Sequence, residues 1–313
     1  MRILLAGATG FIGRHVARAL AAAGHEVVGC ARRRDEAFRR YPEIGWIRAD
    51  FATDCAASVW KPRLFGFDAL VNAVGILRER RGQSFEAVHF GAPRALFQAC
   101  AVLGVHRVIQ VSALGCDANP DSAYQSTKLL AERFLATLDL DWVVVRPSLV
   151  YGEDSPSSAL FRLLARLPVI PLIADGGQRL QPIHVDDLSE IIVRLLARGT
   201  PARATLELAG PRPITYKAML ADLRASLGGG SARYVRIPLT LVRIGAYASD
   251  LIGKGPIGRD TLGMLLHGNV ALNNAAPLLL GRRPTGIGEV ARRGRNHERT
   301  GGNDERRPTH LSL

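Results

Sequence analysis

The stretch RILLAGATGFIGRHVARALAAAG, residues 2–24, decides the fold. Its first apolar residues predict a buried strand, and apolar side chains recur at helical spacing from Phe11 onward. Gly7, Gly10 and Gly13 lie between the two segments. Glycine at such positions lets the backbone approach a diphosphate and lets helix and strand pack closely. The stretch therefore predicts a dinucleotide-binding unit. The residues expected to contact the cofactor here are Gly7, Thr9, Gly10, Phe11, Ile12 and Gly13.

The rest of the first 150 residues repeats this alternation of apolar runs and helical stretches. Further strands are predicted at EVVGC, IGWIRAD, DALVNAV, HRVIQVS and DWVVVRP. Near-continuous apolar strands are typical of parallel sheets that are covered on both faces. The sequence therefore predicts an α/β fold with a doubly wound parallel sheet of the Rossmann type over residues 1–150.

After about residue 150 the pattern changes, and a smaller C-terminal α/β substrate lobe is predicted over residues 151–281, with parts returning to the sheet. Helices are expected there near Leu239–Leu251 and Asp260–His267. Residues 282–313 are rich in Gly, Arg, Asn and Thr and have little periodicity. A disordered basic tail is therefore expected from Arg282.

The chain has 313 residues and a formal net charge of +13. Residues 282–307 hold eight arginines against four acids, but no aromatic residues interleave with them, so nucleic acid is not expected as a partner. The four cysteines lack metal-ligand spacing, which predicts reduced thiols and no metal site. Without a secretory signal or a spanning apolar run, a cytoplasmic location is expected, with peripheral membrane association left open.

The end of the second predicted strand indicates which ribose the cofactor carries. An Asp or Glu there would accept a hydrogen bond from a free 2′-hydroxyl. Instead Arg32, Arg33 and Arg34 follow the strand, and Arg14 lies just past the glycines. Guanidinium groups pair with a 2′-phosphate, which favours NADP(H) over the alternative, NAD(H). The competing interpretation is a solvated basic helix, which would account for at least two of these arginines. Arg32 is the cofactor ligand predicted here.

The C-terminal ends of the next strands supply further cofactor contacts, because ligands lie at that edge of a parallel sheet. Asp50 and Phe51 follow the third strand, where the adenine would lie. The fourth strand ends beside the nicotinamide ribose, with Asn72, Ala73, Val74 and Gly75.

Tyr124 and Lys128, in AYQSTK, lie four residues apart in a predicted helix and therefore share a face. A phenol with a pKa near 10 is a poor acid or base at neutral pH. A lysine ammonium about 4 to 6 Å away, together with a cationic nicotinamide, would favour the phenolate and lower that pKa. Ser112, in VSALG, emerges at the same rim of the sheet. We expect Ser112 to polarise a substrate oxygen, Tyr124 to exchange its proton, and Lys128 to tune Tyr124 and hold the ribose.

Several motifs together resemble the short-chain dehydrogenase/reductase superfamily over about residues 1–280: GATGFIG, NAVG, VSALG, the Tyr124/Lys128 pair, RPSLVYG and QPIHVDDL. The last two are similar to its extended or atypical branch, the NAD-dependent epimerase/dehydratase proteins. More narrowly, NAVGILRE, FEAVHFGAPRALFQAC and LQPIHVDDLSE resemble bacterial relatives of alpha-subcomplex subunit nine of respiratory complex I. That resemblance implies bound NADPH, sometimes held for structural reasons.

The resemblance also implies that Pro147 and Ser148 contact the nicotinamide end of the cofactor. His89 stands where extended members usually place an asparagine that supports a proton-relay water, so His89 either substitutes for it or the relay is absent. His184, followed by Asp186 and Asp187, is interpreted as a strand end before aspartate N-caps of a helix rather than a metal site.

Three functions remain. The first is an NADP(H)-dependent oxidoreductase that acts on a carbonyl or an alcohol. The second is a cofactor-bound structural or assembly protein of a partner such as a respiratory complex, and the third is a nucleotide-sugar epimerase or dehydratase. The apolar stretch SSALFRLLARLPVIPLIADGG favours a lipid-like or quinone-like substrate over a sugar nucleotide.

Overall fold

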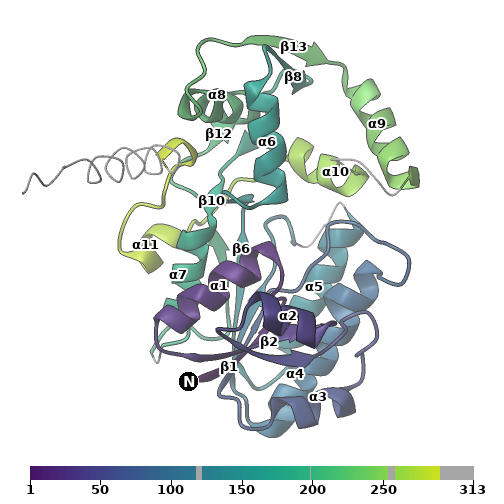
Figure 1. The fold of residues 1–313 in the computed structure, drawn as a ribbon, viewed down its shortest axis with the longest axis vertical. Helices are drawn as coiled ribbons and strands as arrows, with labels where there is room; N and C mark the ends of the chain where they lie inside the picture. Colours follow the sequence, from purple (N-terminus) through teal and green to yellow (C-terminus); the bar gives the residue numbers. More distant parts are fainter. Residues whose placement is uncertain (118–121, 198, 253–257, 290–313) are drawn as a thin grey trace, which may run out of the picture.

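The computed structural model describes residues 1–117, 122–197, 199–252 and 258–289. A seven-stranded parallel sheet organises the chain (Figure 1). Its strands, in spatial order, are β11 (Ala204–Leu208), β6 (Asp141–Pro147), β5 (Arg107–Val111), β4 (Ala69–Asn72), β1 (Arg2–Ala6), β2 (Glu26–Ala31) and β3 (Gly45–Arg48). The strand order reverses between β1 and β4, and ligands of open α/β sheets bind above such a switch point. The doubly wound sheet predicted from the sequence is confirmed.

Helices cover both faces of the sheet because its strands are apolar on both sides. In β1, Ile3 and Leu5 point into one core while Leu4 and Ala6 point into the other, and all four are fully buried. The first face carries α1 (Phe11–Ala22), α2 (Arg34–Arg40), α7 (Val185–Leu195) and α11 (Ala276–Leu280). The second carries α3 (Ala57–Leu64), the π-helix η1 (Glu86–Gly91), α4 (Ala92–Leu103) and α5 (Ala123–Ala136).

A smaller lobe lies above the C-terminal edge of the sheet (Figure 1). It contains α6 (Pro156–Arg166), β8 (Val169–Ile173), α8 (Tyr216–Ser226), β13 (Arg233–Ile237), α9 (Leu239–Ile252) and α10 (Arg259–His267). Its own core includes Ile170, Leu172 and Met219. Two short pairs connect it to the sheet: β7 (Val150–Tyr151) with β10 (Ile183–His184), and β9 (Arg179–Leu180) with β12 (Ile214–Thr215). The lobe is not continuous in sequence, since β11, α7 and α11 return to the large sheet.

The segment 282–289, predicted as the start of a disordered tail, is packed instead. Arg282 Nη2 donates to Asp187 Oδ1 at 2.8 Å, and the Thr285 backbone N–H donates to Asp187 Oδ2 at 2.6 Å. The Asp187 carboxylate is buried on α7 and needs such donors, which explains the ordered contact. The rest of the predicted tail, 290–313, lies outside the described residues.

Candidate functional site

The glycine loop between β1 and α1 is shaped by contacts that exclude side chains. Gly7 has φ +80°, and a Cβ there would lie 2.7 Å from the Ala73 carbonyl carbon. A Cβ on Gly13 would lie 2.1 Å from the Gly7 oxygen. Helix α1 begins after Gly10 with no side-chain cap and no acid in its first turn. The first N–H groups of α1 are therefore left for an anion, and the helix dipole favours a diphosphate there.

Two of the predicted catalytic residues, Tyr124 and Lys128, lie on α5, and Lys128 reaches the C-terminal ends of β4 and β5. Lys128 Nζ donates to the backbone oxygens of Val74, at 3.3 Å, and Val111, at 3.0 Å, so it ties α5 to both strand ends. The same nitrogen lies 5.9 Å from the centre of the Tyr124 ring. An ammonium has three N–H groups, so one donor of Lys128 remains for a ligand.

Ser112 follows β5 at this rim, and its buried Oγ has no hydrogen-bond partner among the described residues. The Cys116 thiol lies near it, but a thiol is a weak partner. Buried hydroxyls are nearly always paired in folded proteins. An unpaired one beside Lys128 is what a site for a polar ligand atom requires.

Burial shifts the pKa values of Tyr124 and Lys128. Burial raises the pKa of Tyr124 above its ordinary value and lowers the pKa of Lys128 to about 8. The sequence predicted a phenol made more acidic by the lysine together with a cationic nicotinamide; in the protein alone, burial sets the direction of the Tyr124 pKa. Tyr124 therefore keeps its proton at neutral pH in the protein alone, and the raised pKa makes it a weaker proton donor than a free phenol.

His89 lies in η1 and holds two neighbouring segments together. Its Nε2 accepts from the Ile76 backbone N–H at 3.0 Å, so its Nδ1 carries the proton and faces Thr127 Oγ1 at 3.1 Å. Burial and the charge of Lys128 lower the pKa of His89 to about 3. Its ring stands edge-on to Tyr124 with centroids 5.1 Å apart. His89 is thus a neutral spacer in the protein alone, and both ring nitrogens are already engaged.

The arginines near the expected ribose differ in whether they already form hydrogen bonds or ion pairs within the protein. Arg33 pairs with Glu36 at 3.1 Å, and Arg34 donates to the Trp46 oxygen at 3.0 Å. Arg14 Nη2 pairs with Asp154 at 2.8 Å and Nη1 donates to the Thr9 oxygen at 3.3 Å. Arg32, exposed directly after β2, makes no hydrogen bond or ion pair within the described part of the chain.

The predicted adenine-side residues lie at the end of β3. Asp50 Oδ1 accepts from the Ala52 backbone N–H at 3.0 Å, which folds the turn. The Phe51 ring is buried and packs against Trp60 with centroids 5.1 Å apart. Asp50 keeps its second carboxylate oxygen, Oδ2, for a ligand, since its other described contacts use the main chain.

Some of the predicted nicotinamide-side residues already form hydrogen bonds within the protein. Asn72 Nδ2 donates to Gln110 Oε1 at 2.7 Å, and Asn72 Oδ1 accepts from the Val74 N–H at 3.2 Å. Gly75 lies against Lys128, whose Nζ would be 3.3 Å from a Cβ there. Asn72 therefore shapes the loop through Ala73 and Val74 rather than offering its amide to a ligand.

Pro147 and Ser148 end β6 beside this loop. The Pro147 oxygen accepts from the Leu114 N–H at 3.0 Å, and Ser148 Oγ donates to the Gln181 oxygen at 2.5 Å. Because that hydroxyl hydrogen is used within the protein, Ser148 can only accept from a ligand. A cavity of about 250 Å³, lined by residues that include Ile214, Asp222 and Ile287, lies elsewhere and shares no lining residue with this site.

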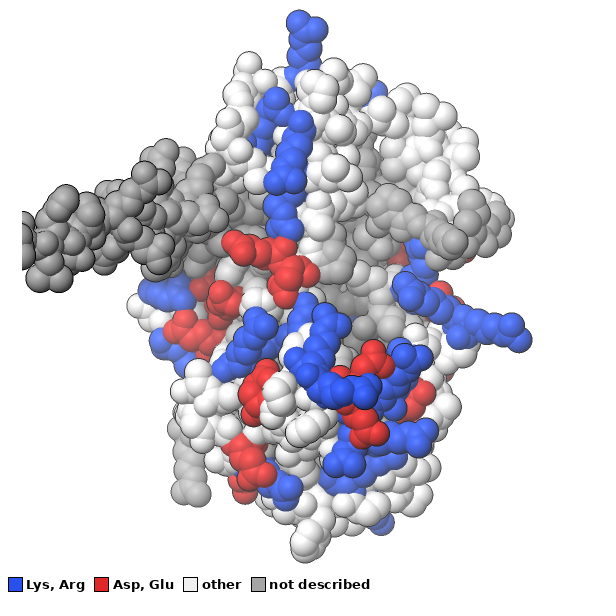
Figure 2. All heavy atoms as spheres, viewed as in Figure 1, with Lys and Arg blue, Asp and Glu red and all other residues white. Residues whose placement is uncertain are grey.

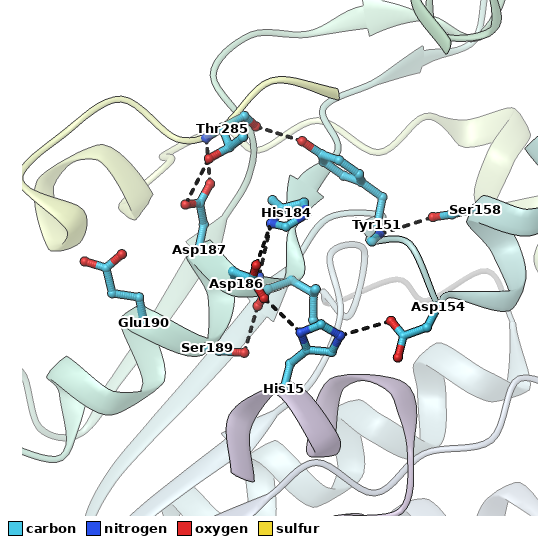
Figure 3. A network of polar contacts seen from close by, with 12 residues as sticks. His15, Tyr151, Asp154, Ser158, His184, Asp186, Asp187, Ser189, Glu190 and Thr285 are labelled. Carbon is cyan, nitrogen blue, oxygen red and sulfur yellow. Dashed lines mark hydrogen bonds and ion pairs between the residues drawn. The ribbon is translucent and has the colours of Figure 1, made fainter. Parts of the chain in front are cut away.

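A charged cluster that sequence reasoning missed joins the dinucleotide half to the lobe (Figure 3). His15 of α1 holds Asp186 Oδ1 at 2.8 Å through Nδ1 and Asp154 Oδ1 at 3.0 Å through Nε2. We call His15, Asp154 and Asp186 the clasp. Partial burial would raise the pKa of Asp154, but hydrogen bonds from His15 and Arg14 lower it to about 2. The partners are 139 and 171 residues from His15 in sequence, so no local pattern reveals them.

The cap of α7 differs from the expectation that aspartates supply it. His184 is the N-cap, and its Nδ1 accepts from the Asp186 N–H at 3.3 Å (Figure 3). Asp186 and Asp187 lie in the first turn, where the helix dipole favours acids. Their carboxylates bond to His15 and to Thr285 instead.

The clasp predicts a pH-dependent stability. The hydrogen bond to Asp186 raises the pKa of His15 above its ordinary 6.5. The stabilisation is then complete below about pH 6.5 and is lost as pH rises through the raised folded value. We expect His15→Gln to lower the free energy of unfolding by on the order of 1 kcal/mol near pH 6 and by less near pH 9, measured by urea denaturation.

Other groups also titrate in this window, so the measured quantity is the difference between parent and variant at each pH. His106→Gln replaces an exposed histidine and serves as the control. An equal loss from His15→Gln at both pH values would contradict a charged clasp.

A profile of the NAD dependent epimerase/dehydratase family matches residues 3–206. A ceramide reductase from Caulobacter vibrioides is 30% identical over 240 residues, which is 75% of this chain and 73% of that protein. The mitochondrial NADH dehydrogenase 1 alpha subcomplex subunit 9 of Arabidopsis thaliana is 28% identical over 258 residues, 80% of this chain, but the chain spans 64% of its length.

Solved structures share the fold at low sequence identity. A nucleoside-diphosphate-sugar epimerase from Staphylococcus aureus superposes with a TM-score of 0.72 at 16% identity, covering 93% of this chain and 99% of that one. The UDP-glucose 4-epimerase of Thermus thermophilus, in complex with NAD, gives 0.70 at 20% identity, covering 94% and 99%.

The fold and the matched sequence define a Rossmann-type protein of the extended short-chain dehydrogenase/reductase class. The chain belongs to the NAD dependent epimerase/dehydratase family. Among the described residues, no helix combines the length and the apolar character needed to cross a bilayer.

Proposed function

We propose that this protein is an oxidoreductase that uses NADP(H) to interconvert a carbonyl and an alcohol. The observation that carries the proposal is the unpaired, buried Ser112 hydroxyl, which follows Val111 in the chain, the residue whose oxygen accepts from Lys128. Tyr124 lies one turn before Lys128 on α5, with its ring centre 5.9 Å from the Lys128 nitrogen. The cofactor would supply the hydride. Tyr124 would donate the proton to the substrate oxygen, Ser112 would hydrogen-bond that oxygen, and Lys128 would use its remaining N–H on the nicotinamide ribose.

The proposed substrate is apolar, either lipid-like or quinone-like. The lobe above the site includes α6 and β8, whose sequence is largely apolar, and Leu163 and Val169 there are exposed. A relative at 30% identity is a ceramide reductase, which acts on a lipid by its name. A cytoplasmic location belongs to the same proposal, and the free cysteines of the described chain fit a reducing compartment.

The preference for NADP(H) rests on Arg32, the unpaired arginine after β2. A charge-assisted hydrogen bond to the 2′-phosphate is worth about 1.5–3 kcal/mol. Arg32→Ala should therefore weaken NADPH binding by about 10- to 100-fold and leave NADH binding unchanged within a factor of about three. Titration of nicotinamide fluorescence with each cofactor measures both constants.

Arg33→Ala is the matched control, because Arg33 is exposed on the same segment and pairs with Glu36. It should leave both constants unchanged. If the parent binds NADH as tightly as NADPH, the preference is wrong, although dinucleotide binding stands.

A cofactor-bound structural protein with little turnover is the second candidate. His89, at the expected position of the relay asparagine, is neutral and bonded on both sides, so it is poorly suited to pass a proton through its ring. The similarity to a subunit of the mitochondrial NADH dehydrogenase alpha subcomplex supports the same candidate. On this alternative NADPH still binds, and Tyr124→Phe changes no activity.

A further inference from the structure

Helix α9 is apolar on its outer face as well as its inner one. At about 100° per residue, Leu241, Ile244 and Tyr247 share one side of the helix, where they are 59%, 61% and 52% exposed. The opposite side places Ala246 and Ser249 in the lobe, where both are buried. A surface helix normally turns polar residues outward, so this outer face indicates a further contact.

The rim of this face is basic. Arg243 lies one turn before Tyr247, is exposed, and makes no hydrogen bond or ion pair to the described residues. The Arg259 guanidinium lies 5.3 Å from the centre of the Tyr247 ring. Figure 2 shows the α9 surface, at the upper right, as largely uncharged. We call Leu241, Ile244, Tyr247 and Arg243 the α9 face.

The surroundings of the α9 face carry the same sign of charge. From β13 to the end of α10, the described residues contain four arginines (Arg233, Arg236, Arg243 and Arg259) against two aspartates (Asp250 and Asp260). Asp250 is the acid of α9, and Arg259, at 3.1 Å, and Arg78, at 3.4 Å, neutralise it. Arg236, on the strand that leads into α9, is exposed without a described partner. An apolar stripe in a basic surround is the pattern of helices that lie on anionic membranes.

Two other occupants match the α9 face less well. The C-terminal stretch of this chain, 290–313, is predominantly polar and basic, so it offers little apolar surface and the wrong charge. A second copy would bring two basic lobes together, which like-charge repulsion disfavours. An anionic lipid surface satisfies both the apolar and the basic requirement.

We propose that the α9 face docks the protein on the surface of an anionic bilayer, without spanning it. Leu241, Ile244 and Tyr247 enter the boundary between headgroups and acyl chains, and Arg243 contacts lipid phosphates. This docking stands independently of the proposed reaction, although it would give the site access to apolar substrates held in the membrane.

Vesicle flotation of the full chain tests the docking. The parent should bind phosphatidylcholine vesicles that contain phosphatidylglycerol, should bind pure phosphatidylcholine weakly, and should be released by salt. Replacing Leu241, Ile244 and Tyr247 together by Ser should lower the partition coefficient by on the order of 100-fold or more. Arg243→Glu alone should lower it by about fivefold or more.

Leu272→Ser with Leu278→Ser is the matched control, because these leucines are 90% and 86% exposed outside α9. This variant should bind vesicles like the parent. NADPH titration checks that every variant folds and keeps its cofactor site, so a failed docking is distinguishable from a failed function. Parent-like vesicle binding by the triple variant, or a parent dimer that the triple substitution dissociates, would overturn the proposal.

Discussion

Tyr124→Phe is expected to lower carbonyl reduction by about 10²- to 10⁴-fold, the usual contribution of a positioned acid. Tyr124 is buried, and Lys128 Nζ lies 5.9 Å from the centre of its ring, so the phenol keeps its proton until substrate and cofactor are bound. Oxidation of NADPH, followed by fluorescence with a long-chain ketone and with a quinone as acceptors, measures the loss. The NADPH dissociation constant should stay within a factor of about three, because the hydroxyl is assigned to the substrate.

Tyr216→Phe is the matched control for this change. Tyr216 is also buried, at 2% exposure, but lies in the core of the small lobe on α8. Removing its hydroxyl should leave turnover unchanged. If Tyr124→Phe and Tyr216→Phe retain the same activity, Tyr124 is not the acid. The second candidate function, a cofactor-bound structural protein with little turnover, is then favoured.

The sheet was predictable because its signals are local. Apolar runs such as RILLA and turn glycines such as Gly7 are read within a few residues, and the predicted strands appear as β1 to β6. The domain boundary at residue 150 was less predictable. The short strand ATLEL pairs with β6 across a separation of about sixty residues, and nothing within it distinguishes a seventh sheet strand from a lobe strand.

The candidate site likewise has a part that local sequence signals predict and a part that depends on distant contacts. The sequence places Tyr124 and Lys128 on a helix and Ser112 after a strand, and α5 and β5 are present where these signals predict them. The clasp depends on chain segments that meet only in the folded protein. The Tyr124 pKa shows the same limit: a sequence does not show the burial that raises this pKa in the protein alone, whereas the predicted lowering also included a bound cationic nicotinamide.

Gly13→Ala is expected to abolish tight cofactor binding. The new Cβ would lie 2.1 Å from the Gly7 oxygen, 2.7 Å from the Gly7 carbonyl carbon and 2.9 Å from the Ala8 Cα. All three are backbone atoms, so no side-chain rotation relieves the clash, and the diphosphate loop must move away from α1. Overpacking of this kind costs about 1–3 kcal/mol of stability, and the displaced loop should weaken NADPH binding by at least about 100-fold.

Gly263→Ala separates this clash from the general effect of alanine in a helix. Gly263 lies within α10, and a Cβ there would meet no atom within 4 Å. Alanine is favoured over glycine in a helix by about 0.5–1 kcal/mol, so this control should unfold at a slightly higher urea concentration and bind NADPH normally. Gly13→Ala gains the same propensity and should still be the less stable variant. If it instead matches the control in both NADPH affinity and stability, α1 and the loop are not in the close contact that brings the first N–H groups of the helix to a diphosphate.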